Sequence, residues 1–305
     1  MAVHSKPVLD APGSIKPRLK GFKAFLTHQT FRRISQIGFA AFIVFLVVRQ
    51  IVIGEDGSIV VASAEAYCPF GGLETLYKFI TSGGSFVSHT HLSNVVLLIA
   101  VLAVAFLLRS AFCGWICPLG SIQDLVSSIS KGLQKKLPWL RRGISSFKKR
   151  GTLFAILDRY LRYIKYLVLV WAIGGSAYFG YMVFRDYDPW SALIGIAEFS
   201  FTPGVIILIV TLAASFFVER PWCRYACPLG AASGILGKLS PIYLKREESA
   251  CTICKICTNS CPMGLEIHNA TTIKSADCIT CLECVGACPR NGALEVKLGL
   301  PLMGK

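Results

Sequence analysis

The chain has 305 residues, of which 53% are hydrophobic and only 16% are charged, and its formal net charge is +15. Soluble globular domains carry about 25% charged residues, so this composition argues against a soluble protein and favours an integral membrane protein. In a membrane protein the excess of Lys and Arg is expected to hold loops on the cytoplasmic side, so no nucleic-acid partner is predicted.

Four stretches are apolar and long enough to cross a bilayer core of about 30 Å, which needs about 20 helical residues. They are Ile34–Ile53, Ser93–Phe112, Tyr160–Phe184 and Pro203–Val218. Residues 1–30 are basic and lack the apolar core of a signal peptide, which is typical of a cytoplasmic tail. The sequence therefore predicts an α-helical membrane domain with four transmembrane helices over residues 31–240.

Lys and Arg are distributed unevenly among the segments that flank these stretches. The tail and the segment between the second and third stretches are strongly basic, whereas the loops 54–92 and 185–202 are acidic. Because basic loops stay in the cytoplasm, we expect a multi-pass protein of the prokaryotic cytoplasmic (inner) membrane with both termini inside. Asp158, Arg162 and Lys165 precede the apolar part of the third stretch and are expected at the inner membrane interface.

The predicted membrane domain contains an internal repeat, with copies at 31–130 and 151–240. In each copy an apolar stretch ends in Cys-x3-Cys-Pro-Leu-Gly and an amphipathic stretch follows. Two copies with the same topology imply a pseudo-two-fold axis along the membrane normal. We therefore expect equivalent parts of the two copies to lie next to each other.

Cys68 is aligned by this repeat with Asp188, and both fall in the acidic loops that are expected outside. Thiolate and carboxylate both bind metals, so one interpretation of Cys68 and Asp188 is a metal site at the outer face. The alternative is that Cys68 is a packed turn residue beside Pro69. His89 and His91 are more typical of helix-capping or solvent-facing histidines than of quinone or haem ligands.

The cysteine pairs of the two copies are Cys113/Cys117 and Cys223/Cys227. The i, i+4 spacing places each pair on one face of a helix, and the repeat axis brings the two pairs together at the inner side. Four converging thiols predict a third iron–sulfur cluster, either [4Fe–4S] or [2Fe–2S]. The alternatives are four buried free thiols or a redox-active dithiol.

Residues 245–300 lack long apolar stretches and carry the run Cys-x2-Cys-x2-Cys-x3-Cys-Pro twice. In bacterial ferredoxins three cysteines of such a run bind one [4Fe–4S] cluster and the fourth binds the other cluster. One predicted ligand set is Cys251, Cys254, Cys257 and Cys288, and the other is Cys278, Cys281, Cys284 and Cys261. Zinc is the alternative, but the third cysteine and the proline in both runs argue against it. The sequence therefore predicts a small α+β ferredoxin domain of the bacterial 2[4Fe–4S] type.

The segments FCGWICPLG and WCRYACPLG, followed by the double ferredoxin run, resemble the membrane polyferredoxins of the NapH/NosR type. The resemblance covers roughly residues 30–295. It implies electron transfer between the quinone pool, cytoplasmic carriers and extracytoplasmic reductases or flavoproteins. The longer NosR-like members have a large flavin-binding domain before the first span. This sequence has no such domain there, so an outside redox partner is expected to be a separate chain.

We therefore expect an electron-transfer subunit of a membrane redox complex rather than a complete enzyme, since the sequence has no nucleophile–base arrangement and no nucleotide fingerprint. The expected partners are other subunits of the complex, a cytoplasmic ferredoxin or flavodoxin, a quinone, and an extracytoplasmic flavoprotein or cytochrome. Lys255, Lys274 and Lys297 are candidates for attracting acidic partners. The alternative functions are a stand-alone quinone or metal-ion reductase and an iron–sulfur redox sensor.

Overall fold

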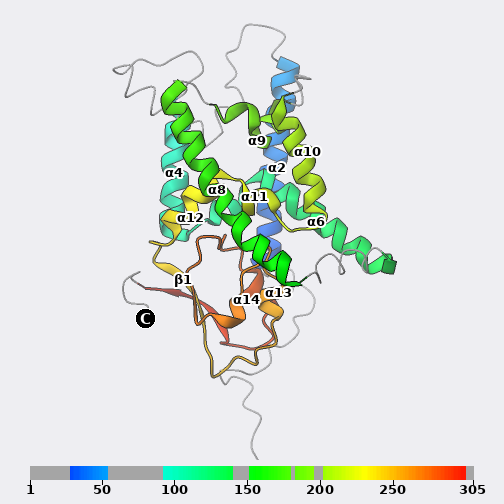
Figure 1. The fold of residues 1–305 in the computed structure, drawn as a ribbon, viewed down its shortest axis with the longest axis vertical. Coiled ribbons are helices and arrows are strands. Elements are labelled where there is room, and N and C mark those ends of the chain that lie inside the picture. The colour runs from blue at the N-terminus through cyan, green and yellow to red at the C-terminus, as the bar shows by residue number, and fades with distance from the viewer. Residues whose placement is uncertain (1–27, 54–91, 140–150, 180–182, 196–201, 300–305) are drawn as a thin grey trace, which may run out of the picture.

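The structure is a computed structural model that describes residues 28–53, 92–139, 151–179, 183–195 and 202–299. In this part of the chain the residues before 240 form a group of helices. The residues after 240 form a small domain that lies against one end of that group (Figure 1).

No helix among the described residues is both long and apolar enough to span a membrane, so the predicted integral membrane fold with four transmembrane helices is wrong. Two predicted spans form helices that are too short, because α4 (Leu92–Leu108) has 17 residues and α10 (Pro203–Ser215) has 13. The other two lie in longer helices, α2 (His28–Ile53) with 26 residues and α8 (Gly151–Phe179) with 29. Four charged residues lie in the first half of α8.

The two copies of the predicted repeat fold into the same order of elements: an apolar helix, a short helix that holds the first cysteine, and a helix that begins at a proline. These elements are α4, α5 (Ala111–Trp115) and α6 (Pro118–Lys136) in the first copy, and α10, α11 (Pro221–Tyr225) and α12 (Pro228–Gly237) in the second. Between α8 and α10 the chain forms η3 (Arg185–Tyr187) and α9 (Pro189–Gly195). The exact boundaries of the repeat and of the domains stay predictions.

The helical core lies where the two copies meet. Leu119 of the first copy is buried together with Leu208 and Trp222 of the second, and with Phe184 before η3. The rings of Phe184 and Trp222 stack with their centroids 6.3 Å apart. In addition α12 packs against α4, and α6 packs against α10. Each copy therefore supplies the packing surface that the other copy needs to bury its apolar side chains.

The C-terminal domain is a three-stranded antiparallel sheet with short helices around it. The strands β1 (Ile242–Arg246), β2 (Thr272–Ile273) and β3 (Leu294–Leu298) have the order β2-β1-β3, and the helices are α13 (Ile256–Asn259), η5 (Ile267–Asn269) and α14 (Glu283–Ala287). Leu244 of β1 pairs with Ile273 and with Val296. Its side chain is buried beside Ile267 and several cysteines. This small α+β arrangement agrees with the predicted ferredoxin domain.

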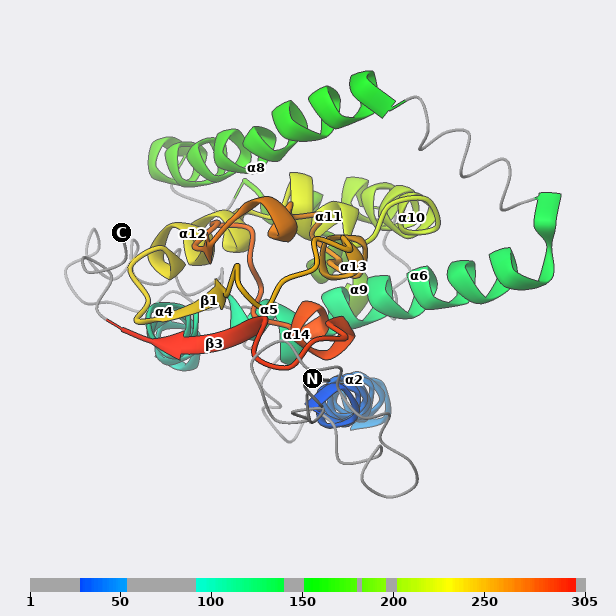
Figure 2. The same ribbon diagram turned by 90° about the horizontal axis from the view of Figure 1, so that it is seen from below.

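The C-terminal domain approaches the helices so closely that two contacts require glycine. A Cβ atom on Gly114 of α5 would stand 2.4 Å from the carbonyl oxygen of Ile279, and one on Gly234 of α12 would stand 2.5 Å from that of Ala276. Because α5 and α12 belong to different copies, both copies hold the same C-terminal segment. Figure 2 shows the C-terminal elements over the centre of the helical group, between α8 and α2.

Candidate functional site

The two predicted ligand sets of the C-terminal domain each surround a cavity. The first cavity is lined by Cys251, Cys254, Cys257 and Cys288. The second cavity is lined by Cys278, Cys281, Cys284 and Cys261. In each set the fourth cysteine comes from the other run, as in the crossed ligand pattern of bacterial ferredoxins. The structure therefore brings these eight cysteines together in the sets that the sequence predicts.

The backbone between the cysteines has a conformation that suits a cluster. Ile253 and Lys255 of the first loop (251–257) have φ angles of 52° and 60°, and Thr280 and Leu282 of the second loop (278–284) have φ angles of 48° and 58°. Residues other than glycine enter this left-handed region at a cost of about 1–2 kcal/mol. Left-handed residues within a turn point successive N–H groups into one concavity, which binds anions and iron–sulfur clusters.

The donor chemistry of both cavities is that of a [4Fe–4S] cluster. Four cysteine thiols surround each cavity, and such clusters are held by four thiolates. Within the described ranges, no three or more His, Cys, Asp or Glu side chains converge on the position of a single metal ion.

The four cysteines of the helical part lie near one another. Cys113 and Cys223 are buried, and Cys117 and Cys227 are half-buried. Burial raises the pKa of the Cys113 thiol to about 12, and repulsion from Cys117 and Cys223 adds to this effect. Burial also raises the pKa of Cys223, to about 11. Thiols with raised pKa values stay protonated at neutral pH unless a metal displaces the proton.

Cys117 and Cys227 do not continue the short helices that hold Cys113 and Cys223. Each is the residue before the next helix, with ψ of 115° and 114° respectively, because the proline that follows disfavours helical backbone in the preceding residue. The prediction that each pair lies on one face of a helix is therefore wrong. The N–H of Gly230 donates to the sulfur of Cys227 at 3.3 Å, as is favourable for a thiolate that binds iron.

An ion-pair network fixes the backbone around these cysteines. The guanidinium of Arg220 is fully buried, and it donates to the carbonyl oxygen of Cys113 at 2.5 Å and to both carboxylate oxygens of Asp124 at 2.7 and 2.6 Å. Arg32 of α2 donates to Asp124 at 2.6 Å and to Glu283 of α14 at 3.1 Å. Burial opposes ionisation of Asp124, but the charges of Arg220 and Arg32 outweigh burial and lower its pKa.

Hydrogen bonds attach the second loop, and the residues before it, to the first copy of the repeat. Arg109, which directly follows α4, donates to the carbonyl oxygens of Ile273 at 2.9 Å and of Ser275 at 2.6 Å. The indole N–H of Trp115 donates to the carbonyl oxygen of Thr280 at 3.0 Å. These bonds hold the loop that carries three cysteines of the second cavity.

Charged residues of α8 bind the same part of the C-terminal domain, rather than a membrane interface as predicted. Asp277 pairs with Lys165, and with Arg162 at 3.0 Å. Asp158 pairs with Arg162 at 2.9 Å and with Arg224 of α11 at 2.6 Å. The second loop is therefore held from both copies of the repeat and from α8.

The first loop is exposed, in contrast to the second. The side chains of Ile253 and Ile256 are 61% and 42% exposed, and Cys254 is also exposed. In the second loop Ile279 and Cys281 are buried in one apolar cluster with Cys113. The first cavity therefore faces outwards, and the second cavity lies next to the helical cysteines.

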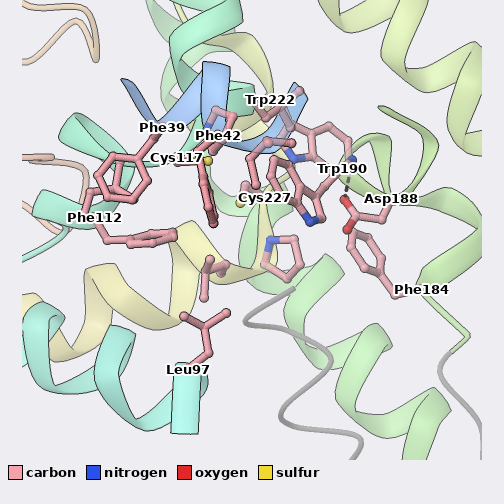
Figure 3. A pocket seen from close by; sticks show the side chains of 16 residues that line it. Phe39, Phe42, Leu97, Phe112, Cys117, Phe184, Asp188, Trp190, Trp222 and Cys227 are labelled. Atoms are coloured by element: carbon pink, nitrogen blue, oxygen red, sulfur yellow. Dashed lines mark hydrogen bonds between the residues drawn. The ribbon is translucent and has the colours of Figure 1, made fainter. Parts of the chain in front are cut away.

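A third and larger cavity, of about 160 Å³, lies in the helical part and is called the large cavity below (Figure 3). Cys117 and Cys227, one from each copy, line it together with aromatic side chains, Asp188 and Trp190. The carboxylate of Asp188 accepts a hydrogen bond from the backbone N–H of Trp190 at 3.1 Å at the start of α9. Burial raises the pKa of Asp188 to about 7.

Cys68, His89 and His91 lie outside the described residues. The predicted metal site of Cys68 and Asp188 therefore stays a prediction. Neither a role for Trp190 nor the network of Arg220 and Asp124 is predicted from the sequence. The signal for Arg220 was present, because a cation directly before an apolar cysteine motif needs a buried partner.

Two families match the chain. The 4Fe-4S binding domain matches residues 90–137 and 200–246, which hold the two Cys-x3-Cys pairs, and the 4Fe-4S dicluster domain matches residues 243–289. No solved structure matches the chain.

Three relatives are similar to most of the chain. The putative electron transport protein YccM of Escherichia coli is 28% identical over 248 residues, which are 79% of this chain and 65% of YccM. The ferredoxin-type protein NapH of Haemophilus influenzae is 32% identical over 200 residues, 62% of this chain and 63% of NapH. The regulatory protein NosR of Stutzerimonas stutzeri is 30% identical over 182 residues, 58% of this chain and 23% of NosR. The chain thus spans less than two thirds of the length of each relative.

Proposed function

Because the chain belongs to the NapH/NosR-type polyferredoxins, we propose that it passes single electrons through three iron–sulfur clusters in a row, as one subunit of a larger redox complex. Membership of this family makes the chain an iron–sulfur electron-transfer protein. The proposed ligands are the four cysteines of the first cavity, the four of the second, and Cys113, Cys117, Cys223 and Cys227. Each cluster, when bound, takes up and releases one electron at a time.

The packing of Cys113 against the second loop carries this proposal. Cys113, Ile279 and Cys281 are buried in one cluster, and Cys261 packs against it. This cluster brings one cysteine of the helical group next to two cysteines of the second cavity. The two cavities in turn belong to one small domain whose ligand sets cross. The three cysteine groups therefore follow one another from the exposed first loop into the helices.

The residues around the cysteines orient them and shield them from water. Arg220 fixes the carbonyl group of Cys113, and Gln123 donates from its side-chain amide to the sulfur of Cys223 at 3.6 Å. Arg109 holds the second loop in place. The protein thus supplies position, hydrogen bonds and exclusion of water, and the clusters supply the redox chemistry.

We place the exchange of electrons with a ferredoxin or flavodoxin at the first loop, because this loop is exposed. Lys255 lies in the first loop and lines the first cavity. It therefore suits the attraction of an acidic carrier. The two other candidate lysines lie on the sheet, where Lys274 stands over the ring of Tyr243 and Lys297 pairs with Glu295 at 2.6 Å.

Exposed apolar side chains support the proposal of further subunits. Ile37 on α2, Ile99 on α4, Leu167 on α8 and Ile206 on α10 are each more than 60% exposed. Exposed apolar surfaces of this kind mark contacts with other proteins or with a membrane. A location at the prokaryotic inner membrane, and an extracytoplasmic flavoprotein or cytochrome as a further partner, stay proposals that rest on the sequence.

The iron content of the anaerobically purified protein tests the proposal. Three cubane clusters give about twelve irons per chain, two give about eight, and two with a [2Fe–2S] centre give about ten. We expect the double variant Cys113→Ser/Cys223→Ser to lose only the third cluster and to keep the EPR signals of the other two. A wild-type protein with eight irons, or a double variant with unchanged iron, would contradict the third cluster.

A further inference from the structure

Two arginines at the boundary between the helices and the C-terminal domain each have one nitrogen without a hydrogen-bond partner. Arg109 directly follows α4 of the first copy, and Arg224 lies in α11 of the second copy. The Nε atoms of both side chains are buried, and neither finds an acceptor among the described residues. A buried N–H group without an acceptor costs free energy, and nearly all such groups in proteins are satisfied. The two donors therefore point to an acceptor that is not one of the described residues.

Four other arginines, all with largely buried side chains, differ from these two because their Nε–H groups have acceptors. The Nε–H of Arg246 donates to the carbonyl oxygen of Ala270 at 3.0 Å, and that of Arg220 donates to the carboxylate of Asp124 at 2.7 Å. The remaining donors of this kind are Arg32, to the carbonyl oxygen of Gly114 at 3.0 Å, and Arg162, to the carboxylate of Asp158 at 3.1 Å. The missing acceptor is therefore a feature of the places where Arg109 and Arg224 lie.

Arg109 lies beside the second cavity. Its Nη1 and Nη2 atoms donate to the carbonyl oxygens of Ile273 and Ser275, and Ile273 lines this cavity. Burial lowers the pKa of Arg109, and the charge of Cys278, which also lines the cavity, opposes this effect. The guanidinium therefore lies near a predicted cluster ligand while its Nε–H has no acceptor among the described residues.

Arg224 lies beside another cysteine of the same ligand set. Its guanidinium covers Gly264, where a Cβ atom would stand 2.8 Å from Cζ of Arg224. Gly264 belongs to the turn that follows Cys261, and its N–H donates to the carbonyl oxygen of Cys261 at 2.9 Å. Burial raises the pKa of the Cys261 thiol, and the charge of Arg224 opposes this rise. The two arginines thus approach two ligands of one predicted cluster, Cys278 and Cys261.

We propose that Arg109 and Arg224 bind the cluster of the second cavity, each through a hydrogen bond from its Nε–H to a sulfur atom of the cluster or of its cysteine ligands. This proposal rests on the proposed cluster in the second cavity, and it adds two residues of the helical part to the cysteines that hold it. Sulfur atoms of iron–sulfur clusters accept hydrogen bonds from the protein, and charged donors form the stronger bonds. The cluster would thereby connect both copies of the repeat to the C-terminal domain.

Pulsed EPR of the reduced holoprotein tests the proposal. The protein is produced with arginine that carries 15N at Nε, because a nitrogen whose proton is bonded to a cluster sulfur receives spin density and gives a hyperfine coupling. The variants are Arg109→Lys and Arg224→Lys, alone and combined, which keep the positive charge and remove the Nε–H. The matched control is Arg246→Lys, because the Nε–H of Arg246 donates to Ala270 instead.

We expect the wild type to show two 15N couplings that are absent from the combined variant. Each single variant should lose one of the two, and Arg246→Lys should keep both. A purely structural role of the arginines would give no coupling, since spin density reaches the nitrogen only through direct contact with the cluster or its ligands. The wild-type spectrum is therefore decisive even where a variant loses iron.

Three results would overturn the proposal. A wild type that holds about twelve irons but shows no 15N coupling would mean that water satisfies the two donors. Couplings that persist in the combined variant would belong to other arginines, as would couplings that Arg246→Lys removes. Iron content that Cys281→Ser leaves unchanged would refute the cluster of the second cavity itself. Because the last result is read from iron and the others from the 15N couplings, the failure of either idea is recognised by itself.

Discussion

Gly114 lies where α5 and the second loop are closest. A side chain there would meet the carbonyl oxygen of Ile279, which is backbone and cannot rotate away. The sequence alone shows Gly114 only as one residue between two cysteines. The need for glycine arises from a contact between residues that are 165 positions apart in the sequence. The nearby hydrogen bond from Trp115 to Thr280 joins residues with the same separation. Local sequence patterns cannot contain such a contact.

Replacement of this glycine should therefore harm the second cluster. We expect Gly114→Ala to lower the free energy of unfolding by about 1–3 kcal/mol through overpacking, and to release iron from the second cavity. Gly132→Ala is the control, since no atom lies within 4 Å of a Cβ at this position of α6. Because alanine is the better helix former, the control should be stabilised by roughly 0.5–1 kcal/mol. Thermal unfolding and iron content measure both effects, and equal behaviour of the two variants would refute the close contact.

At the scale of elements, the breaks before α6 and α12 decide where the cysteines lie. The spacing of the cysteine motifs predicts that both cysteines of a pair lie on one face of a single helix. Pro118 and Pro228 instead start new helices and leave Cys117 and Cys227 in extended conformation. The mutual proximity of the four cysteines followed from the repeat, because equivalent segments of the two copies pack together. The repeat does not predict that Cys113 lies beside the second loop while Cys117 and Cys227 line the large cavity. That difference depends on the breaks before α6 and α12.

The pairing of α11 with α6 through Arg220 and Asp124 gives a prediction for this group of elements. Arg220→Met leaves the buried carboxylate of Asp124 with fewer partners, so we expect a loss of about 3–5 kcal/mol in the free energy of unfolding. Lys131→Ala breaks the ion pair of Lys131 with Glu219, in which the lysine side chain is 55% exposed. This variant should lose less than about 1 kcal/mol in the free energy of unfolding. Denaturant unfolding of both variants measures the difference. Similar losses in the two variants would mean that Arg220 is not held in the buried network.

At the scale of the whole molecule, the ferredoxin domain was predicted correctly, whereas the membrane-spanning architecture was not. The structure brings together the cysteines of both predicted ligand sets. The ferredoxin run predicts well because its spacing is imposed by cluster geometry over a few residues. The apolar stretches led to a wrong prediction of membrane spans, because hydropathy alone does not show where a helix ends. Asp158, Arg162 and Lys165 illustrate a further limit, since their partners in the C-terminal domain can be recognised only in the folded molecule.

The exposure of the first loop and the burial of the second predict the order in which the clusters are lost. In air with a chelator, we expect about a third of the iron to leave first, from the first cavity, because oxidants reach exposed cysteines more readily. Arg109→Met should speed the loss from the second cavity several-fold by weakening the attachment of its loop. Lys238→Met removes an exposed cation as the control and should not do so. Iron release followed with EPR measures the phases, and a single phase for all iron would contradict this order.

The cations that attach the second loop would also act on the reduction potential of a cluster bound there. Arg109 interacts electrostatically with Cys278, and Arg32 with Cys281, both from positions that are shielded from water. Fixed positive charge favours the reduced form of a cluster and so raises its reduction potential. The exposed first loop is more strongly screened by solvent and salt. The contacts that assemble the protein therefore also place positive charge beside the cysteines of the second cavity.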